Sequence, residues 1–485
     1  MAKVVIMGAG ISGHTAALYL KRGLPKEHEV IVVSPNSKWN WIPSNIWVGV
    51  GVLNKEDVTF PLQPVYDKVG IQFHQAKAVS IHPEGSVQQL KPYIKIESTK
   101  DQDKGQTAEI TYDFLINATG PKLNFTATPG LGPESNSLSV CTFSHAEETA
   151  KELAHCIERM RKGEQLTFVI GTGHGMCTCE GAAFEYVFNL EFELQRAGVR
   201  NKARLVFLTN EAELGDFGVG GMIFETGGFT VPSKVFAESM FTERNIEVIK
   251  GAHVEKVDKN SVSYELLSGE KGTVSFDFAM LLPPFSGVGL KSFAKDGSEI
   301  TEKLFAPNGF LKVDAHYEAK TYEEWAPTDW PSTYQNQTFK NIFGIGIAFA
   351  PPHPISKPRK SKNGTNITPA PPRTGMPSAI MGRVVAHSII EMIQTGKTDA
   401  PYGASLAEIG AACVASAGAN WFKGSAASMT MYPIVPDYRR YPRGGRSMVY
   451  TFGEVGAAGH WIKQILHYMF LYKAQAKPFW WLIPE

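Results

Sequence analysis

The amino-terminal glycine loop constrains the fold of this chain more than any other sequence feature. Residues 3–7 read as a buried strand that runs directly into Gly8-Ala-Gly-Ile-Ser-Gly13, and a helix is expected from there through Leu20. The first glycine permits a tight turn, the second lets the backbone approach a pyrophosphate, and the third allows close helix–strand packing. The start of the helix attracts the phosphate charge. With a second strand at 29–33, the pattern predicts a dinucleotide-binding βαβ unit.

The identity of the dinucleotide depends on two further segments. The predicted second strand is followed by Ser34, where an Asp or Glu normally binds a ribose hydroxyl, so Ser34 or Asn36 is left to make that hydrogen bond. Residues 112–120 end in Ala118-Thr-Gly120, which looks like the strand end of flavoproteins with two dinucleotide-binding domains. This segment favours FAD over NAD at the first glycine loop, although an ordinary strand ending at a glycine turn is the alternative.

A second strand, glycine loop and helix begin at residue 166. Here Gly171-Thr-Gly-His-Gly-Met176 is followed at once by Cys177-Thr-Cys179, and the closing strand at 204–208 lacks a clean acidic partner for a ribose. We therefore expect the fold of a second nucleotide domain whose nucleotide chemistry has been displaced by thiols. A cysteine near a helix start tends toward thiolate because the helix field favours an anion. A buried, inert cysteine is the alternative for each thiol.

Charge and composition exclude several classes of protein. The 485 residues suggest about three folded units. Lys plus Arg number 48 and Asp plus Glu 47, so no basic field for nucleic acid is expected. Five cysteines are too few for a disulfide framework. The first residues run straight into a strand and no window offers about 18 apolar residues, so neither a signal peptide nor a transmembrane helix is expected.

The carboxyl-terminal stretch predicts an amphipathic helix over residues 459–473. Apolar residues recur there at helical spacing, with Lys463, Gln464 and His467 on the opposite side. The apolar positions are Trp461, Ile462, Ile465, Leu466, Met469 and Tyr472. Lys473, Lys477, Trp480 and Trp481 read as anchors at a membrane interface. A helix packed on the protein's own core is the alternative reading of the same periodicity.

Segments spread over nearly the whole chain resemble sulfide:quinone oxidoreductases. They are Gly8–Gly13, Pro43–Gly51, Ala118–Lys122, Ser139–Thr142, Cys179–Tyr186, Leu282–Val288 and Asn341–Ala348. The resemblance implies an α/β fold with two Rossmann-like dinucleotide-binding domains and a C-terminal amphipathic-helix region that associates with a membrane. It assigns residues 1–165 and 301–400 to the FAD-binding domain, 166–300 to the second domain, and 401–485 to the redox-cysteine and membrane region.

The activity implied by the resemblance is FAD-dependent oxidation of sulfide to sulfane sulfur or polysulfide at a cysteine disulfide next to the flavin. Electrons would pass to a membrane quinone, and the chain would be a homo-oligomer lying peripherally on the cytoplasmic membrane. Two enzymes remain as alternatives: an NADH:quinone oxidoreductase of the same architecture, and the flavoprotein subunit of a sulfide dehydrogenase with a haem partner. A non-catalytic flavin-binding scaffold or sensor is the alternative from another class.

The resemblance also implies catalytic residues. Cys179 matches the family cysteine in the helix after the second glycine loop, and Cys141 matches a third cysteine that assists in some members. His145 lies in the expected Cys-Thr-x-x-His stretch. One departure concerns proton handling, because Gly215-Asp216-Phe217-Gly218 stands where family members often carry a Gly-His-x-Gly segment.

The partner of Cys179 should lie in a Cys-x-Ala-x-x-Gly segment near the C-terminal region. Cys413–Gly418 fits that pattern, whereas Ser405–Gly410 fits in a competing register that puts serine at the redox position. We favour Cys413, because the chemistry fails without a second thiol. If the Ser405 register is right, Cys177 is the remaining candidate partner.

The same reasoning names the residues around the cofactor. The expected cofactor-binding residues are Gly8, Gly10, Ile11, Ser12, Gly13, Ser34, Ser44, Ala118, Gly120, Gly346 and Gly375. Arg373 stands where family members often carry Lys, so a positive charge near the flavin pyrimidine or the quinone is expected with altered geometry. Glu185 is expected in the same vicinity. No cluster has metal-ligand spacing, and no metal is expected.

Overall fold

A parallel sheet built from the amino-terminal strands forms the first layer of the molecule. The computed structural model describes residues 1–178, 180–226, 228–373, 375–420 and 423–485. The first sheet has the order β21-β8-β1-β2-β5-β6-β7, with β20 also paired to β5. Its strands are β1 (Lys3–Met7), β2 (Glu29–Ser34), β5 (Gln72–His82), β6 (Tyr93–Ser98), β7 (Thr107–Thr111), β8 (Phe114–Asn117), β20 (Lys291–Ser292) and β21 (Ile342–Gly344). Strands β21, β8, β1, β2 and β5 are parallel, as expected for strands whose side chains are largely buried.

Two long helices cover this sheet and cross each other closely. They are α1 (Ile11–Gly23) and α9 (Met376–Thr395). A Cβ on Gly382 of α9 would lie 2.3 Å from the Ser12 carbonyl oxygen of α1, so a glycine is required at this crossing. The predicted strand–loop–helix unit is confirmed, and the carboxyl ends of β1, β2, β8 and β21 meet at one edge of the sheet.

The second layer repeats the arrangement. A four-stranded parallel sheet has the order β14-β11-β10-β18. Its strands are β10 (Leu166–Thr172), β11 (Ala203–Leu208), β14 (Glu247–Ile249) and β18 (Phe278–Leu282), with helices α5 (Phe143–Arg161), α6 (Glu180–Arg196) and α7 (Ser233–Glu243) around them. An antiparallel sheet of β15 (Ala252–Asp258), β16 (Ser261–Leu266) and β17 (Lys271–Ser275) flanks it. The domain boundaries given above stay a prediction.

The remaining short elements connect and edge these layers. The segment that follows β2 contains β3 (Lys38–Asn40), η1 (Ile42–Ser44), α2 (Asn45–Gly49), α3 (Lys55–Val58), β4 (Thr59–Pro61) and α4 (Leu62–Val69). Elsewhere lie β9 (Lys122–Leu123), β12 (Ile223–Thr226), β13 (Phe229–Pro232), β19 (Phe285–Ser286), α8 (Thr301–Leu304) and η6 (Gly346–Ala348). Further single turns are η2 (Phe125–Ala127), η3 (Arg200–Lys202), η4 (Tyr322–Glu324), η5 (Pro327–Asp329) and η7 (Trp480–Leu482).

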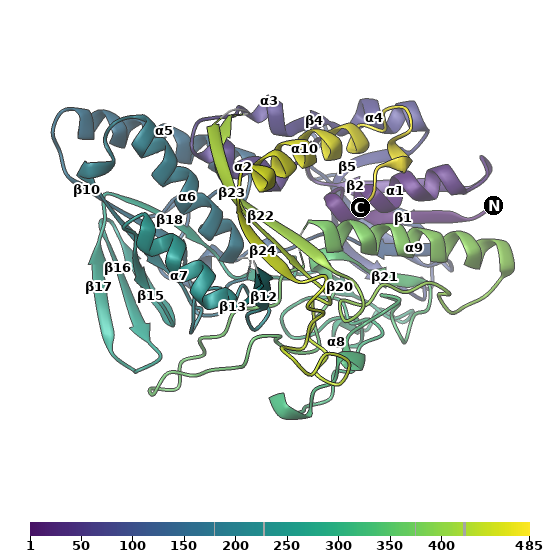
Figure 1. The fold of residues 1–485 in the computed structure, drawn as a ribbon. Helices are drawn as coiled ribbons and strands as arrows, with labels where there is room; N and C mark the ends of the chain where they lie inside the picture. The colour runs from purple at the N-terminus through teal and green to yellow at the C-terminus, as the bar shows by residue number, and fades with distance from the viewer. Residues whose placement is uncertain (179, 227, 374, 421–422) are drawn as a thin grey trace.

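The carboxyl-terminal part lies between the two parallel sheets, as Figure 1 shows. Strands β22 (Ala411–Asn420), β23 (Lys423–Met431) and β24 (Phe452–Gly456) form an antiparallel sheet, and β24 leads directly into α10 (Ala457–Ala474). Strand β22 packs on α6, and α10 crosses β22 and β23. Of the helices in the described ranges, none combines the length and the hydropathy that crossing a membrane requires.

Helix α10 is amphipathic, but its polar face is buried and its apolar face is exposed. Most of its buried side chains are polar, namely His460, Lys463, Gln464, His467 and Lys473, whereas Trp461, Ile465 and Tyr468 are 51%, 47% and 54% exposed. The predicted apolar face therefore does not pack on the protein's own core. This orientation is unusual for a helix on a globular protein, whose apolar side normally faces inward.

Two of the four predicted interface anchors are wrong. Lys473 is buried, because its ammonium pairs with Glu485 at 2.5 Å and donates to the Ile483 carbonyl. Trp480 is buried against the Tyr19 ring of α1. Both residues hold the carboxyl-terminal tail onto the first layer, so only Lys477 and Trp481 reach the surface.

Candidate functional site

The first glycine loop leaves room for a ligand at its middle glycine. The Cβ position of Gly10 has no atom within 4 Å, and no side chain caps the start of α1 there. Gly8, by contrast, has φ +104° and would place a Cβ 2.1 Å from the Ala118 carbonyl oxygen. A Cβ on Gly13 would lie 2.1 Å from the Gly8 carbonyl oxygen. Gly8 and Gly13 are thus required for packing, and Gly10 leaves the helix start open to an anion.

The neighbouring strand ends extend this open region. Gly120, after β8, and Gly375, before α9, have φ +70° and +62°, and neither Cβ position has an atom within 4 Å. Gly346 has φ +65° and lies close to the Ser12 and Ser378 hydroxyls, where a Cβ would be 2.5 Å and 3.4 Å away. The loop, two strand ends and the start of α9 therefore surround one cradle at the edge of the sheet. A dinucleotide fits it, because side chains are missing where a pyrophosphate needs space.

Two predicted cofactor residues have partners within the chain. Ser34 ends β2, is buried, and its Oγ accepts a hydrogen bond of 3.3 Å from the Asn36 amide. The Ser44 Oγ lies 2.9 Å from the His467 Nδ1 of α10, and burial lowers the pKa of His467 to about 4. Ser44 thus ties α10 to the first layer, and contact of either serine with a cofactor stays a prediction.

Cys413 lies beside the first turn of α6. A Cβ built on Gly181 would be 3.6 Å from the Cys413 Sγ, and Gly181 follows Cys179 by two positions. Cys179 itself lies outside the described residues. Ser405 occupies a buried turn before β22, where its Oγ accepts a hydrogen bond from the Ala407 amide. Of the two registers, the arrangement favours Cys413 as the residue that reaches α6.

The other cysteines differ in their surroundings. Cys177 is fully buried, its thiol donates to the Leu282 carbonyl at 3.1 Å, and burial raises its pKa well above the usual range. The expectation of a thiolate is therefore wrong for Cys177, because α6 begins only at Glu180 and its field does not offset desolvation. Cys156 is also buried, with its pKa raised to about 12.

Cys141 and His145 lie at the start of α5. Cys141 is half-buried and immediately precedes Thr142, whose hydroxyl caps the helix by accepting a 3.2 Å hydrogen bond from the His145 amide. The His145 ring packs edge-on against Phe125, and burial lowers its pKa. A catalytic role for either residue stays a prediction.

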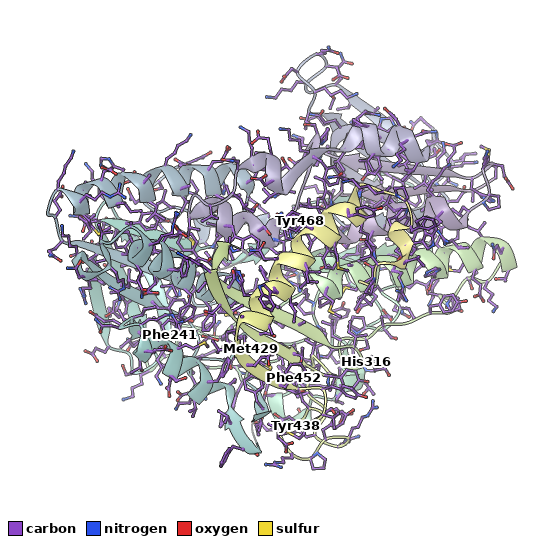
Figure 2. All side chains as sticks on the ribbon, turned by 45° about the horizontal axis from the view of Figure 1, so that its top comes forward. Phe241, His316, Met429, Tyr438, Phe452 and Tyr468 are labelled. Carbon is purple, nitrogen blue, oxygen red and sulfur yellow. The ribbon has the colours of Figure 1, made fainter. Side chains whose placement is uncertain are left out.

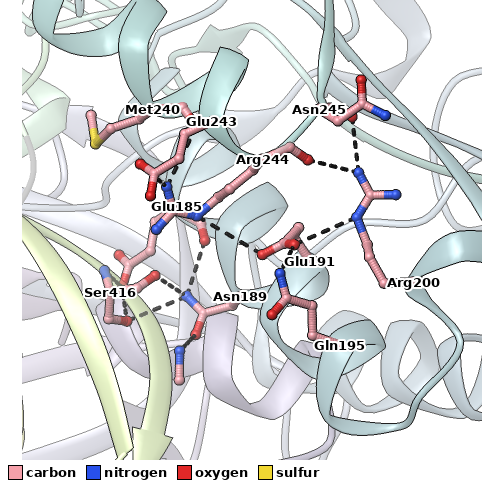
Figure 3. A network of polar contacts seen from close by, with 11 residues as sticks. Glu185, Asn189, Glu191, Gln195, Arg200, Met240, Glu243, Arg244, Asn245 and Ser416 are labelled. Carbon is pink, nitrogen blue, oxygen red and sulfur yellow. Dashed lines mark hydrogen bonds and ion pairs between the residues drawn. The ribbon is translucent and has the colours of Figure 1, made fainter.

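Glu185 is the centre of a buried polar network that joins three parts of the chain, seen in part in Figure 3. Its carboxylate accepts hydrogen bonds from the Ser416 amide (3.0 Å) and hydroxyl (2.6 Å), and pairs with the Lys463 ammonium at 3.0 Å. The Trp47 indole donates to the Ser416 hydroxyl at 2.9 Å. Helix α6, strand β22 and helix α10 are thus connected through one carboxylate. Sequence reasoning placed Lys463 on the polar side of the C-terminal helix without a partner, and it missed Ser416. Nothing in the local sequence around either residue indicates a contact with Glu185.

Arg373 is a buried cation without a carboxylate. Its guanidinium lies 4.7 Å from the Phe310 ring centre and donates to the Phe349 carbonyl, and burial lowers its pKa to about 9. Its Nε has no hydrogen-bond partner, and no described carboxylate lies within ion-pair distance of the group. A buried, unpaired charge is costly, so this position favours an anionic ligand.

The second glycine loop is filled by the chain itself. A Cβ on Gly173 would lie 2.5 Å from the Leu131 side chain, and one on Gly175 would lie 2.4 Å from the Asn366 carbonyl oxygen. The loop amides are already used, since Gly173 donates to the Leu282 carbonyl and Gly175 to His253 Nδ1. Residues 366–371 cross the loop, where the Thr368 amide donates to the Gly175 carbonyl at 2.8 Å. No room remains there for a pyrophosphate.

Carboxylates also occupy the start of α6, where a second nucleotide would bind. Burial raises the pKa of Glu180, Glu211 and Asp216; nearby Glu211 and Asp216 raise that of Glu180 further, and Asp216 raises that of Glu211, which reaches about 8. Asp216 is hydrogen-bonded by the Ser356 hydroxyl and by the Gly218 amide at 3.0 Å. Burial thus favours the protonated form of these carboxyls, which lie at the start of α6 where a nucleotide phosphate would bind. Among the described residues, no group of His, Cys, Asp and Glu is arranged to hold a metal ion.

Comparison with known proteins assigns the family. The pyridine nucleotide-disulphide oxidoreductase family matches residues 2–193. A sulfide-quinone reductase from Aquifex aeolicus is 31% identical over 476 residues, which cover 98% of this chain and 92% of that protein. The chain belongs to the sulfide:quinone oxidoreductase family. It is accordingly an oxidoreductase and a flavoprotein whose cofactor is FAD, so the predicted fold class, enzyme class and cofactor are confirmed.

Solved structures agree with the family assignment. The sulfide:quinone oxidoreductase of Aquifex aeolicus superposes with a TM-score of 0.75 at 30% identity, covering 98% of this chain and 92% of that one. The NDH2 of Plasmodium falciparum, solved with NADH, superposes with a TM-score of 0.63 at 14% identity and covers 98% and 96% of the two chains. This second likeness shows a shared fold.

Proposed function

We propose that this chain oxidises sulfide at a Cys179–Cys413 pair and passes the electrons through FAD to a membrane quinone. The observation that carries the proposal is the closed second glycine loop, which removes the site that an NADH-using relative needs. Cys413 beside the first turn of α6 supports sulfide as the electron donor in place of NADH, with the thiols relaying its electrons. The rival NADH:quinone oxidoreductase would require Leu131, Asn366 and the buried carboxylates to vacate that loop together.

The sulfur chemistry requires only the chain's own groups and the substrate. Hydrosulfide attacks one sulfur of the oxidised cysteine pair, an S–S bond forms to the substrate sulfur, and the Cys–Cys bond breaks. The products are a persulfide on one cysteine and a thiolate on the other, and the substrate proton stays on the persulfide. FAD, when bound, supplies a two-electron acceptor. When the persulfide and the thiolate give up two electrons to that acceptor and the persulfide proton leaves, a new S–S bond would join the two cysteines through the added sulfur. The next hydrosulfide would attack this link, and repetition would lengthen the sulfane chain until it leaves as polysulfide.

The residues around the cradle would hold FAD in place. The open Gly10 and the amides that begin α1 would bind its pyrophosphate, and Ser34 would contact a ribose hydroxyl. Arg373, a buried cation with no described carboxylate partner, would hold negative charge at the flavin or quinone end. Glu185, whose carboxylate bonds Ser416 and Lys463, would keep β22 and its Cys413 against α6.

The orientation of helix α10 supports a membrane surface as the place of reaction. A quinone partitions into lipid, and the exposed Trp461, Ile465 and Tyr468 give α10 an apolar outer face. The buried polar face is fixed to the protein through Lys463, which pairs with Glu185, and through His467, which bonds Ser44. The helix would thus be held rigidly while its apolar side enters the interface. Which membrane and which side it faces stay predictions.

An anaerobic titration tests the proposal. Sulfide should bleach the flavin absorbance of the wild-type protein, and a soluble quinone analogue should restore it, whereas NADH should leave it unchanged. Cys413→Ser should abolish bleaching by sulfide, because no second thiol remains to leave. Cys156→Ser, a buried cysteine remote from α6's first turn, is the matched control and should bleach as wild type does. Bleaching by NADH, or unimpaired bleaching in Cys413→Ser, would overturn the assignment; re-oxidation by cytochrome but not quinone would favour the haem-partner alternative.

A further inference from the structure

The exposed apolar surface does not end with α10. It continues back along the chain through β24 and the segment before it, where Val449 and Tyr450 are 78% and 65% exposed and Phe452 and Val455 are also exposed. More than half of the large hydrophobic side chains exposed among the described residues lie between 438 and 482. Figure 2 labels Tyr468, Phe452 and Tyr438 one below another along this side of the molecule. Contiguous exposed apolar area of this kind marks an interaction surface.

A cluster of arginines borders the same surface. Arg439, Arg440 and Arg443 are exposed in the loop that precedes Val449. Asp437, the nearest acid in sequence, accepts the backbone amides of Arg439 and Arg440 rather than their guanidinium groups. No described carboxylate lies within 4 Å of either guanidinium, whereas Arg443 lies 3.7 Å from Glu225. Two cations therefore stand beside exposed aromatic side chains with no counter-ion among the described residues.

We propose that residues 437–455, here called the arginine loop, form a second membrane contact that binds anionic phospholipid headgroups. The proposal rests on the membrane role proposed for α10 and adds a lipid selectivity to it. Arg439 and Arg440 meet the phosphates, and Val449, Tyr450 and Phe452 enter the interface between headgroups and acyl chains.

Continuity and charge favour a lipid surface over another protein. Strand β24 passes into α10 at Gly456 without a loop, so the arginine loop and the exposed face of α10 belong to one continuous segment. At the far end of that segment Lys477 is exposed and lies over the Tyr472 ring. Apolar side chains flanked at both ends by cations and aromatic rings are the pattern of a peripheral membrane helix. If α10 alone contacted the membrane, Arg439 and Arg440 would have no anionic partner among the described residues or in the lipid.

Vesicle co-sedimentation tests the proposal on the full-length flavoprotein. Vesicles of phosphatidylcholine alone are compared with vesicles containing phosphatidylglycerol, at low and high salt. Arg439→Gln with Arg440→Gln should weaken partition onto the anionic vesicles by about tenfold or more, at about 1 kcal/mol per charge, and leave partition onto neutral vesicles unchanged. Arg359→Gln with Lys360→Gln removes an equal charge from another exposed pair and should change neither.

The outcomes separate this proposal from the proposed function. An undiminished preference of the arginine variant for anionic vesicles would overturn the lipid contact, and so would a loss equal to that of the Arg359–Lys360 control. Self-association that Tyr450→Ser abolishes in sedimentation velocity would assign the surface to a second copy and also overturn it. Bleaching of the flavin by sulfide, measured without vesicles, should be unchanged in every variant; failure of that assay in the wild type would instead contradict the proposed function.

Discussion

The two glycine loops of this chain share a sequence pattern and differ in what lies against them. Each follows a buried parallel strand and precedes a helix, yet the Cβ position of Gly10 is open and that of Gly173 is 2.5 Å from the Leu131 side chain. Helix α1 begins one residue after Gly10, whereas α6 begins seven residues after Gly173. The comparison teaches that a glycine pattern fixes a backbone path. Whether a nucleotide binds depends on segments distant in sequence, here residues 366–371.

The starts of helices α1 and α6 also differ in their acidic residues. No acidic residue lies in the first turn of α1, so its amide groups remain available to a phosphate. In the first turn of α6 stands the buried Glu180, and Glu211 and Asp216 lie near enough to raise its pKa further. The chain's own carboxyl groups thus lie at the start of α6, whereas the start of α1 is open to a bound anion. Four substitutions can break or sharpen this contrast.

Gly10→Ala should have the largest effect. The new methyl group meets no protein atom, and φ −72° at this position suits alanine, so the FAD-free chain should unfold at the wild-type temperature. The methyl enters the space expected for the pyrophosphate, so FAD affinity should fall by about tenfold to hundredfold. Titration of the FAD-free protein with FAD measures this loss. Wild-type affinity in Gly10→Ala would mean that the open loop does not bind the cofactor.

Glu211→Gln should change the pH dependence of stability. The pKa of Glu211 is raised from 4.5 to about 8 by burial, so the folded chain binds a proton that the unfolded chain releases. Stability from this group is complete below the unfolded pKa of 4.5 and falls as pH rises toward 8, by up to about 1.4 kcal/mol per pH unit. Glutamine cannot ionise, so the variant should lose the part of the pH dependence of the unfolding free energy that Glu211 contributes.

Unfolding midpoints at several pH values between 5 and 8 measure the slope. Glu164→Gln is the control, because Glu164 is exposed and its substitution should leave the slope intact. An unchanged slope in Glu211→Gln would show that the fold does not hold Glu211 in its protonated form.

Local pattern was sufficient for the parts of this chain whose partners are near in sequence. The strand at 3–7, the loop to Gly13 and the helix that follows it were predicted from periodicity and glycine spacing. The cysteines and the missing acid predicted that the second loop has lost its nucleotide chemistry to thiols, but not that other segments close the loop. Leu131, His253 and Asn366 reach Gly173 and Gly175 from three separate segments, and no spacing in the sequence encodes that meeting.

The carboxyl-terminal helix shows the same limit. Its periodicity identified two faces correctly, but periodicity alone could not say which face would be buried. That choice depends on Glu185 and Ser44, distant residues that accept Lys463 and His467 as partners. The burial of Lys473 and Trp480 depends likewise on the tail and on Tyr19.

Gly173→Ala should reverse the outcome of Gly10→Ala. Its Cβ would lie 2.5 Å from the Leu131 side chain and 3.1 Å from the Leu282 carbonyl oxygen, so neighbouring groups must shift. Such overpacking costs about 1–3 kcal/mol, which should lower the unfolding temperature. FAD affinity and the response to sulfide should stay at wild-type values, because nothing binds at this loop. A loss of FAD affinity in Gly173→Ala, with stability unchanged, would contradict the distinction between the two loops.

Cys177→Ala should have the smallest effect. Cys177 lies at the end of the second loop, two residues before Cys179, and its thiol makes one hydrogen bond to the Leu282 carbonyl. Losing that bond and one sulfur atom should cost about 1 kcal/mol of stability. Because burial keeps the thiol protonated, bleaching of the flavin by sulfide should proceed as in the wild type. If bleaching is lost in Cys177→Ala while the protein stays folded, Cys177 rather than Cys413 is the partner of Cys179. The second glycine loop would then take part in the redox reaction.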